Sequence, residues 1–108
     1  SDKLIGSFGV MGGQYQAAGH AYVLSQMIDF GLNPQLALNY PRIFPNNNIL
    51  DIEKGFDKEV IDELKSRGHV INYPSLPIGG GQMILTDEDR SVLIGASDWR
   101  KDGLAIGY

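Results

Sequence analysis

The sequence predicts an α+β fold, in which helices and short strands are mixed along a chain of 108 residues. Two observations indicate this. Apolar residues recur at helical spacing in some segments, and short apolar segments bounded by turn residues lie between and after them. A hydrophobic fraction of 43% is ordinary for a globular protein, and the length suits one domain or part of a larger one.

Residues 4–11 are predicted to form a short strand that leads into the glycine pair Gly12-Gly13. A first helix is expected over about 16–30. Its buried face should be the one on which apolar residues recur at spacings of four, three and four. These residues are Ala17, Ala21, Leu24 and Ile28. Gly31 suits the position just past the end of this helix.

A short second helix is predicted at 34–39, because Asn33 is a plausible N-cap and Pro34 suits the first turn. One proline and three asparagines then favour a loop at 45–48. The alternating residues 49–53 predict a short strand.

The third helix, at about 58–67, has the clearest predicted boundaries. Asp57 is a good N-cap, and Phe56 and Ile61 occupy the two positions of a hydrophobic staple. Gly68 is the expected residue just past the helix end.

The last third of the chain is predicted to be strands and loops. A brief strand is expected at 69–71, and the Pro/Gly-rich stretch 72–81 favours a loop. Two strands, 82–86 and 91–95, should follow, joined by the charged turn 87–90.

The composition excludes several classes of function. Nine Lys and Arg against 13 Asp and Glu give a net charge of −4, and the basic residues are scattered, which argues against a nucleic-acid surface. No stretch approaches the roughly 18–20 apolar residues of a membrane span. The absence of cysteine excludes disulfides and thiolate metal sites. The compartment stays open, cytoplasmic or exported.

No metal or cofactor site is predicted. His20 and His69 are far apart in the sequence, and no set of Asp, Glu and His has ligand spacing. His20 is expected to pack against or cap a neighbour. An N-terminal Ser can be a nucleophile, but no strand pattern around Ser1 positions one.

Two glycine-rich segments are candidate anion sites. Gly12 and Gly13 follow a predicted strand and could present adjacent backbone N–H groups to a developing oxyanion. The alternative is a tight turn or a close crossing between strand and helix. The run 79–81 lacks the following Lys-Ser or Lys-Thr of a phosphate loop, so a flexible loop or the start of a strand is the better interpretation.

Several segments in order resemble the gamma-glutamyltransferases and their acylase-like relatives. The resemblance runs from about Phe8 to Tyr108 and is specific through the order of its motifs. These are Gly9-Val10-Met11-Gly12-Gly13 with Gln16 and Gly19-His20, 28–33 followed by 37–42, 64–69, Gly80-Gly81-Gln82, and 95–103 with Gly107-Tyr108 at the end.

The resemblance implies the C-terminal part of the small subunit of an N-terminal nucleophile hydrolase, an αββα sandwich that uses no cofactor. In this family a precursor cleaves itself and exposes a Thr that attacks a gamma-glutamyl amide. Water or an acceptor then resolves the acyl-enzyme. By the resemblance, the backbone N–H groups of Gly12 and Gly13 would stabilise the oxyanion.

The sequence also departs from the family pattern. Val10-Met11 stands where many members have Ser-Pro, and Trp99 replaces a common Pro, so another acyl group is possible. The Thr and the substrate-clamping residues belong to upstream segments. We therefore expect 1–108 to be an incomplete catalytic domain that is inactive alone, leaves apolar faces uncovered and associates with itself or with the missing segment. The alternatives are a non-catalytic relative used as a binding or structural module, and a stand-alone binding domain.

Overall fold

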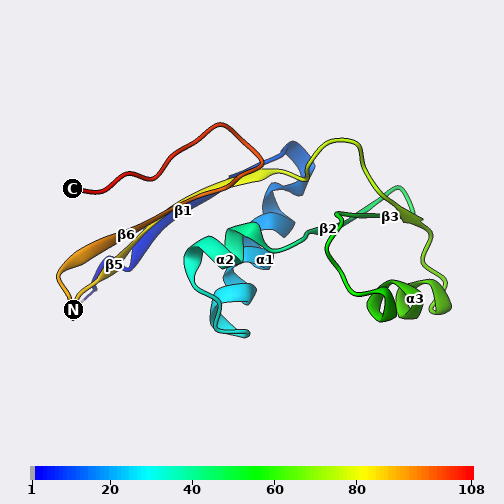
Figure 1. Ribbon diagram of the computed structural model, residues 1–108, viewed down its shortest axis with the longest axis horizontal. Coiled ribbons are helices and arrows are strands. Elements are labelled where there is room, and N and C mark those ends of the chain that lie inside the picture. Colours follow the sequence, from blue (N-terminus) through cyan, green and yellow to red (C-terminus); the bar gives the residue numbers. More distant parts are fainter. Residues whose placement is uncertain (1) are drawn as a thin grey trace. The chain divides into compact units, whose positions relative to one another are not determined.

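The computed structural model describes residues 2–108 and confirms the α+β class, with three α-helices, a short 3-10 helix and six strands (Figure 1). Contacts between residues divide the chain into two compact units. Unit 1 comprises the chain up to Tyr40 together with Gly79–Tyr108, and unit 2 is the intervening segment Pro41–Ile78. Ser1 lies outside the described residues.

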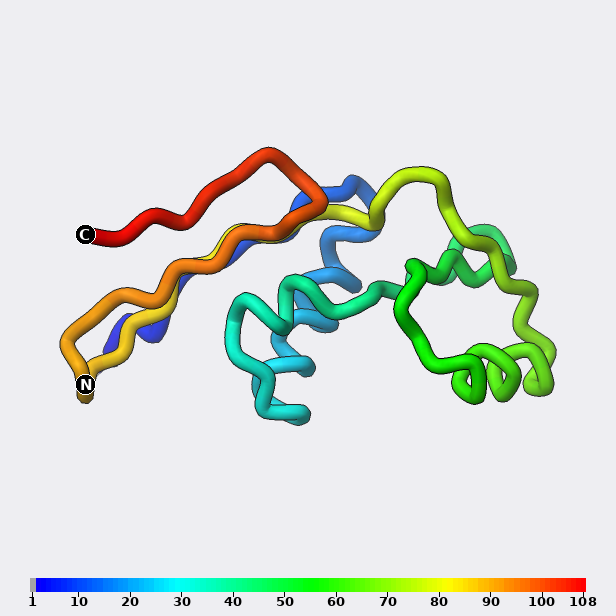
Figure 2. Tube along the Cα trace, viewed as in Figure 1, coloured from blue at the N-terminus to red at the C-terminus, as the bar shows by residue number. Residues whose placement is uncertain are grey.

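Unit 1 is built on an antiparallel sheet of three strands in the order β1-β5-β6. These strands are β1 (Gly6–Met11), β5 (Gly80–Asp87) and β6 (Val92–Ser97). Figure 2 shows β1, near the start of the chain, beside β5, from the last third of the chain. Met11 lies opposite Gly80, so the end of β1 meets the start of β5.

Two helices, α1 (Gln16–Ile28) and α2 (Pro34–Asn39), pack against this sheet. The predicted Asn33 cap is confirmed, because its Oδ1 accepts a hydrogen bond of 2.9 Å from the Leu36 N–H. The Gln35 amide bonds both the N–H and the carbonyl of Ser97, at 3.1 and 2.8 Å. It thereby satisfies part of the free edge of β6.

The face of α1 predicted to be buried is the wrong one. The buried residues are Gly19, Val23 and Gln26, whereas Leu24 is 38% exposed and Ile28 is 75% exposed. Ala17 and Ala21 are exposed as well. The physical reason is close approach: a Cβ on Gly19 would lie 2.7 Å from the Val10 side chain, so the glycine face alone lets the helix approach β1 this closely.

Unit 2 has its own small sheet, in the order β2-β3-β4. Its elements are β2 (Ile43–Asn46), β3 (Ile49–Ile52), α3 (Lys58–Ser66) and β4 (Ile71–Asn72). The predicted loop at 45–48 is wrong in its first half. Asn47 and Asn48, at φ of 50° and 63°, form a two-residue hairpin turn. Pro45 fits β2 because that strand is an edge.

The third helix occupies its predicted place but is capped differently. Asp57 is at the N-cap position, yet its side chain makes no capping hydrogen bond. Gly68 has a φ of 92°, which confirms the predicted left-handed residue after the helix. Ile61 packs into a core with Leu50 and Ile52. The partly buried residues around that core are Ile43, Phe56, Leu64 and Ile71.

The two places where the chain enters and leaves unit 2 are hydrogen-bonded to each other. The Glu53 carboxylate accepts from the Arg42 N–H at 2.9 Å and from the Ile78 N–H at 3.0 Å. Arg42 Nη1 donates to the Ile78 carbonyl at 2.8 Å. Charge-assisted bonds of this kind are stronger than neutral ones, so the base of unit 2 is closed by its own residues.

Candidate functional site

The glycine pair forms a sharp turn between β1 and the first helical turn of unit 1. Gly12 has φ and ψ of 140° and 27°, and Gly13 has a φ of 59°, so both occupy backbone regions that favour glycine. The carbonyl of Gly12 accepts from Tyr15 at 3.1 Å, and that of Gly13 accepts from Gln16. The turn continues through the 3-10 helix Gly13–Tyr15 into α1.

The backbone N–H groups of this turn are available as donors. Within the described part of the chain, no acceptor receives a hydrogen bond from the N–H of Gly12 or Gly13. Both lie at the N-terminal end of a helical segment, where the backbone dipoles favour negative charge. A Cβ on Gly13 would meet nothing within 4 Å, so this side of the turn is open to an incoming group. Chemically, the turn can bind an anion or a developing oxyanion.

A second glycine segment, 79–81, packs against the turn. Gly79 has a φ of 66°, and a Cβ there would lie 2.7 Å from the Met11 carbonyl oxygen. A Cβ on Gly12 would lie 3.0 Å from the Gly79 Cα. The two backbones are therefore in van der Waals contact, which side chains would prevent. Gly80 and Gly81 begin β5, so the interpretation of this run as the start of a strand is confirmed.

His20 of α1 is hydrogen-bonded to Val10, near the end of β1. Its Nδ1 donates to the Gln16 carbonyl at 2.7 Å, and its Nε2 accepts from the Val10 N–H at 3.3 Å. This pattern requires the neutral ring with the proton on Nδ1. His20 thus caps a strand N–H, as expected from the sequence. His69 lies in unit 2, and no group of three or more potential ligands occurs among residues 2–108.

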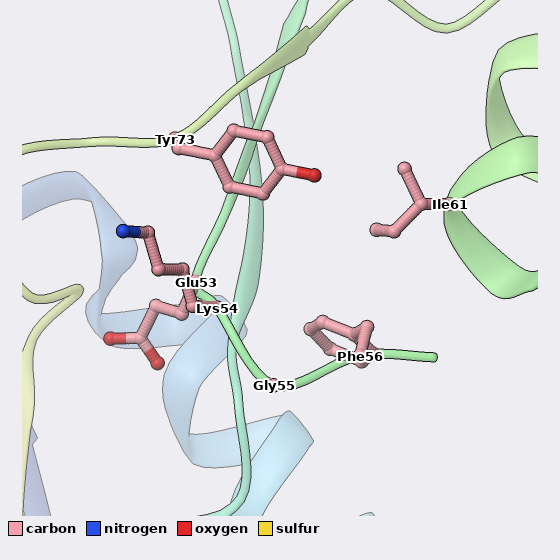
Figure 3. A pocket seen from close by; sticks show the side chains of 6 residues that line it. All are labelled: Glu53, Lys54, Gly55, Phe56, Ile61 and Tyr73. Carbon is pink, nitrogen blue, oxygen red and sulfur yellow. The ribbon is translucent and has the colours of Figure 1, made fainter. Parts of the chain in front are cut away.

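Other surfaces of the molecule are separate from the turn. A cavity of about 270 Å³ in unit 2 lies beside Phe56, Ile61 and Tyr73, and the Ile61 side chain points from α3 toward the two rings (Figure 3). A larger hollow of about 800 Å³ lies between strands β5 and β6 and the terminal segment 104–108. No described helix has the length and apolar character of a membrane span.

One buried pair of charged residues was missed by the reasoning from single residues. Asp98 and Arg100 are both buried and their side chains are 3.0 Å apart. Their hydrogen-bond partners lie 17 and about 60 residues away in the sequence, so no local pattern marks them. Only the resemblance of the segment 95–103 to a known motif drew attention to this region.

A family model and several known proteins match this chain. The model of the family described as gamma-glutamyltranspeptidase matches residues 1–108. The chain is 31% identical over 110 residues to the glutathione hydrolase-like YwrD proenzyme of Bacillus subtilis, covering 93% of this chain and 21% of that protein. It is 28% identical over 107 residues to the glutathione hydrolase proenzyme of the same organism, covering 98% and 18%.

Solved structures agree. Cephalosporin acylase from Bacillus halodurans is 40% identical with a TM-score of 0.84, and the match covers 96% of this chain and 20% of that one. A gamma-glutamyltranspeptidase from Pseudomonas nitroreducens shares the fold at 23% identity, with a TM-score of 0.85 and coverage of 96% and 55%. The chain spans about a fifth of the length of the curated relatives it matches. With the whole chain matched by one family model and the same fold found in its members, this chain belongs to the gamma-glutamyltranspeptidase family.

Proposed function

We propose that residues 1–108 are the C-terminal segment of the catalytic domain of a gamma-glutamyltransferase or hydrolase, and that the longer protein cleaves gamma-glutamyl amides such as glutathione. The observation that carries the proposal is the pair of available N–H groups at Gly12 and Gly13, at the start of a helix in a chain of this family. The names of the relatives, which include two glutathione hydrolase-type proenzymes, support it.

The proposed reaction is acyl transfer. A hydroxyl nucleophile from an upstream segment forms a bond to the amide carbonyl carbon, and the π electrons move onto the carbonyl oxygen. That oxyanion accepts hydrogen bonds from Gly12 and Gly13, and each such donor contributes about 2.7–4 kcal/mol at a transition state. Collapse of this intermediate breaks the C–N bond and expels the amine, which takes up the proton that the hydroxyl gave up. Water or an amine acceptor then attacks the ester and releases the nucleophile.

The acyl group is the least constrained part of this proposal. Val10 and Met11 precede the turn where many family members have Ser-Pro, and the chain is 40% identical to a cephalosporin acylase over nearly its full length. A different acyl group on the same chemistry is therefore the second candidate. It predicts hydrolysis of the acyl amide of a cephalosporin in place of a gamma-glutamyl amide.

The test is release of p-nitroaniline from gamma-glutamyl-p-nitroanilide, measured with the longer protein and with this chain alone. Activity only in the longer protein supports the proposal. Activity in the isolated chain would contradict it and make Ser1 the first residue to substitute. A longer protein that cleaves itself but leaves this substrate intact points to another acyl group. A folded protein that neither cleaves itself nor turns over substrate is a non-catalytic relative.

A further inference from the structure

We propose that the buried Asp98–Arg100 pair positions the Gly12-Gly13 turn for catalysis, a role that rests on the proposed function. Both are positioning residues, because their side chains bond to the backbone at the start of β5 and the end of α2. Their side chains are 0% and 1% exposed, so both members of this ion pair are removed from water.

Asp98 is bonded to the start of β5 through both its backbone and its side chain. Its Oδ2 accepts from the Gly81 N–H at 2.8 Å, and its own N–H donates to the Gly81 carbonyl at 3.0 Å. Because the N–H and the carbonyl of Gly81 belong to the two peptide groups on either side of it, these two bonds hold the backbone on both sides of Gly81. Gly81 is also packed closely against Leu38, because a Cβ there would lie 2.6 Å from that side chain.

Arg100 holds Asp98 in this place and ties it to the end of α2. Asp98 Oδ1 accepts from both the N–H and the Nη1 of Arg100, each at 3.0 Å. The guanidinium also donates to the carbonyls of Leu38, at 2.6 Å, and Tyr40, at 2.9 Å. The Trp99 ring lies 4.8 Å from the guanidinium carbon and adds a cation–π contact. A planar group with several donors is needed to bridge these acceptors.

The anchored peptide is two residues from the support of the glycine turn. Val10 pairs with Gly81 and Met11 with Gly80 in the β1–β5 ladder, and the next residue on each strand brings Gly12 against Gly79. The position of Gly81 is thereby transmitted through two ladder pairs to the turn. No side chain of the turn itself can serve this purpose, because both of its residues are glycines.

Stability alone is a weak explanation for this pair. Replacing a buried ion pair by well-packed apolar residues is often neutral or stabilising, because charges are costly to remove from water. Its directional bonds are suited to defining geometry. Donors that stabilise an oxyanion must be held to within about 0.5 Å, and a displacement of about 1 Å can lower a rate by roughly 100-fold.

The experiment compares three variants of the full-length protein. Asp98→Asn loses the charge and one acceptor, and Arg100→Lys keeps the charge but cannot bridge Leu38 and Tyr40. Glu63→Gln is the matched control, because it breaks an exposed ion pair with Arg67 in unit 2. We expect kcat to fall roughly 10- to 100-fold for Asp98→Asn and less for Arg100→Lys, with KM within about twofold of the unsubstituted value. The control should change neither.

A second readout separates positioning from general weakening of the fold. A boronic acid analogue of the acyl group forms a tetrahedral adduct, so its affinity should fall in parallel with kcat, while the affinity for product should stay unchanged. Circular dichroism shows whether each variant is folded. A folded Asp98→Asn protein with full kcat, or with its loss entirely in KM, would overturn the inference. If Asp98→Asn does not fold, the same criteria apply to Arg100→Lys.

Failure of the proposed function looks different. It appears as an unsubstituted full-length protein that is inactive on every acyl amide tried. The positioning is then still decided by NMR of ¹⁵N-glycine-labelled full-length protein, in which the amide signals of Gly12 and Gly13 should shift in Asp98→Asn and stay in place in Glu63→Gln. Unchanged glycine signals in a folded Asp98→Asn protein would contradict the inference.

Discussion

Unit 1 and unit 2 differ in how completely each buries its own apolar surface. Unit 2 packs a core of Leu50, Ile52 and Ile61 between its sheet and α3, and its base is closed by Glu53 and Arg42. Unit 1 carries the glycine turn and buries one side of its sheet, yet most of the large exposed apolar side chains of the described chain lie in it.

The exposed apolar residues of unit 1 occur on several elements. They include Leu24 and Ile28 of α1, Ile84 and Leu93 of the sheet, and Leu104 and Ile106 near the end of the chain. Large apolar side chains exposed in this number are typical of surfaces that another segment or chain covers. The difference indicates that unit 2 completes its packing by itself, whereas unit 1 leaves apolar side chains exposed, as we would expect if further segments of the proposed catalytic domain pack on it.

The sharpest test of this division uses matched glycines, one in each unit. Gly13 and Gly68 both have a positive φ, and a Cβ on either would meet nothing within 4 Å. Ala at either position should cost a similar 1–2 kcal/mol of backbone strain. Only Gly13→Ala should lower kcat, by roughly 100-fold, because it displaces a proposed oxyanion donor. Steady-state kinetics with thermal unfolding measures both effects. Equal kcat values in the two variants would contradict the proposal that the Gly12-Gly13 turn binds the oxyanion.

A core substitution tests whether unit 2 is self-sufficient. Ile52 is fully buried, so Ile52→Ala should destabilise unit 2 by about 2–5 kcal/mol through lost burial and the cavity left behind. Val70→Ala, at an exposed position, should change stability by less than about 0.5 kcal/mol. Amide hydrogen exchange would localise the effect. Loss of protection confined to 43–72 supports an independent unit, whereas equal loss throughout β1 and β5 would contradict it.

An association measurement tests the exposed face of unit 1. The isolated chain should self-associate, and Ile28→Glu should weaken that association by roughly 10- to 150-fold, because one buried isoleucine contributes about 1.5–3 kcal/mol. Val60→Glu, on the exposed part of α3 in unit 2, is the control and should have no effect. Sedimentation equilibrium gives both constants. A monomeric chain at high concentration would argue that the apolar face of α1 has no partner.

The smallest effect is expected at the surface of unit 2. The hydrogen bond from Lys58 lowers the pKa of the Asp62 carboxyl below its ordinary value of 3.8. The pair therefore stabilises the folded state above that range, and the contribution is lost as the pH falls through the lowered pKa. Both side chains are exposed to solvent, so Asp62→Asn should barely change Tm at neutral pH. The check is the Tm of Asp62→Asn and of the unsubstituted chain, measured between about pH 2 and 7. A large difference between the two Tm values that changes with pH would show that the pair contributes more than we expect.

Local chemistry made several elements predictable from the sequence. Asn33 and Pro34 marked the start of α2, and Gly68 marked the end of α3, because capping depends on residues within one turn of the helix. The glycine pair was predicted as a candidate anion site for a similar reason. Positive φ at Gly12 and Gly13 is a property of their own backbone, and a glycine pair after a strand is a signal of it.

The missed features share a different cause. The hairpin around Asn47 and Asn48 was predicted as a loop, because Pro45 argues against a strand unless the strand lies at an edge, and edges are defined only by the assembled sheet. The buried face of α1 was wrong because the helix has apolar residues on more than one side. The packing of Val10 in β1 against Gly19 in α1 determines which face is buried, and this contact joins two separate elements.

By itself, then, the sequence determined the α+β class, most of the helices and strands and the glycine turn, since these depend on spacing and on backbone preferences within a few residues. The tertiary structure decided which faces are buried and which residues support the turn. Gly79 reaches Gly12, and Asp98 reaches Gly81, only after strands from the two ends of the chain have paired. Such contacts depend on the closing of long loops in the chain, which no pattern of neighbouring residues encodes.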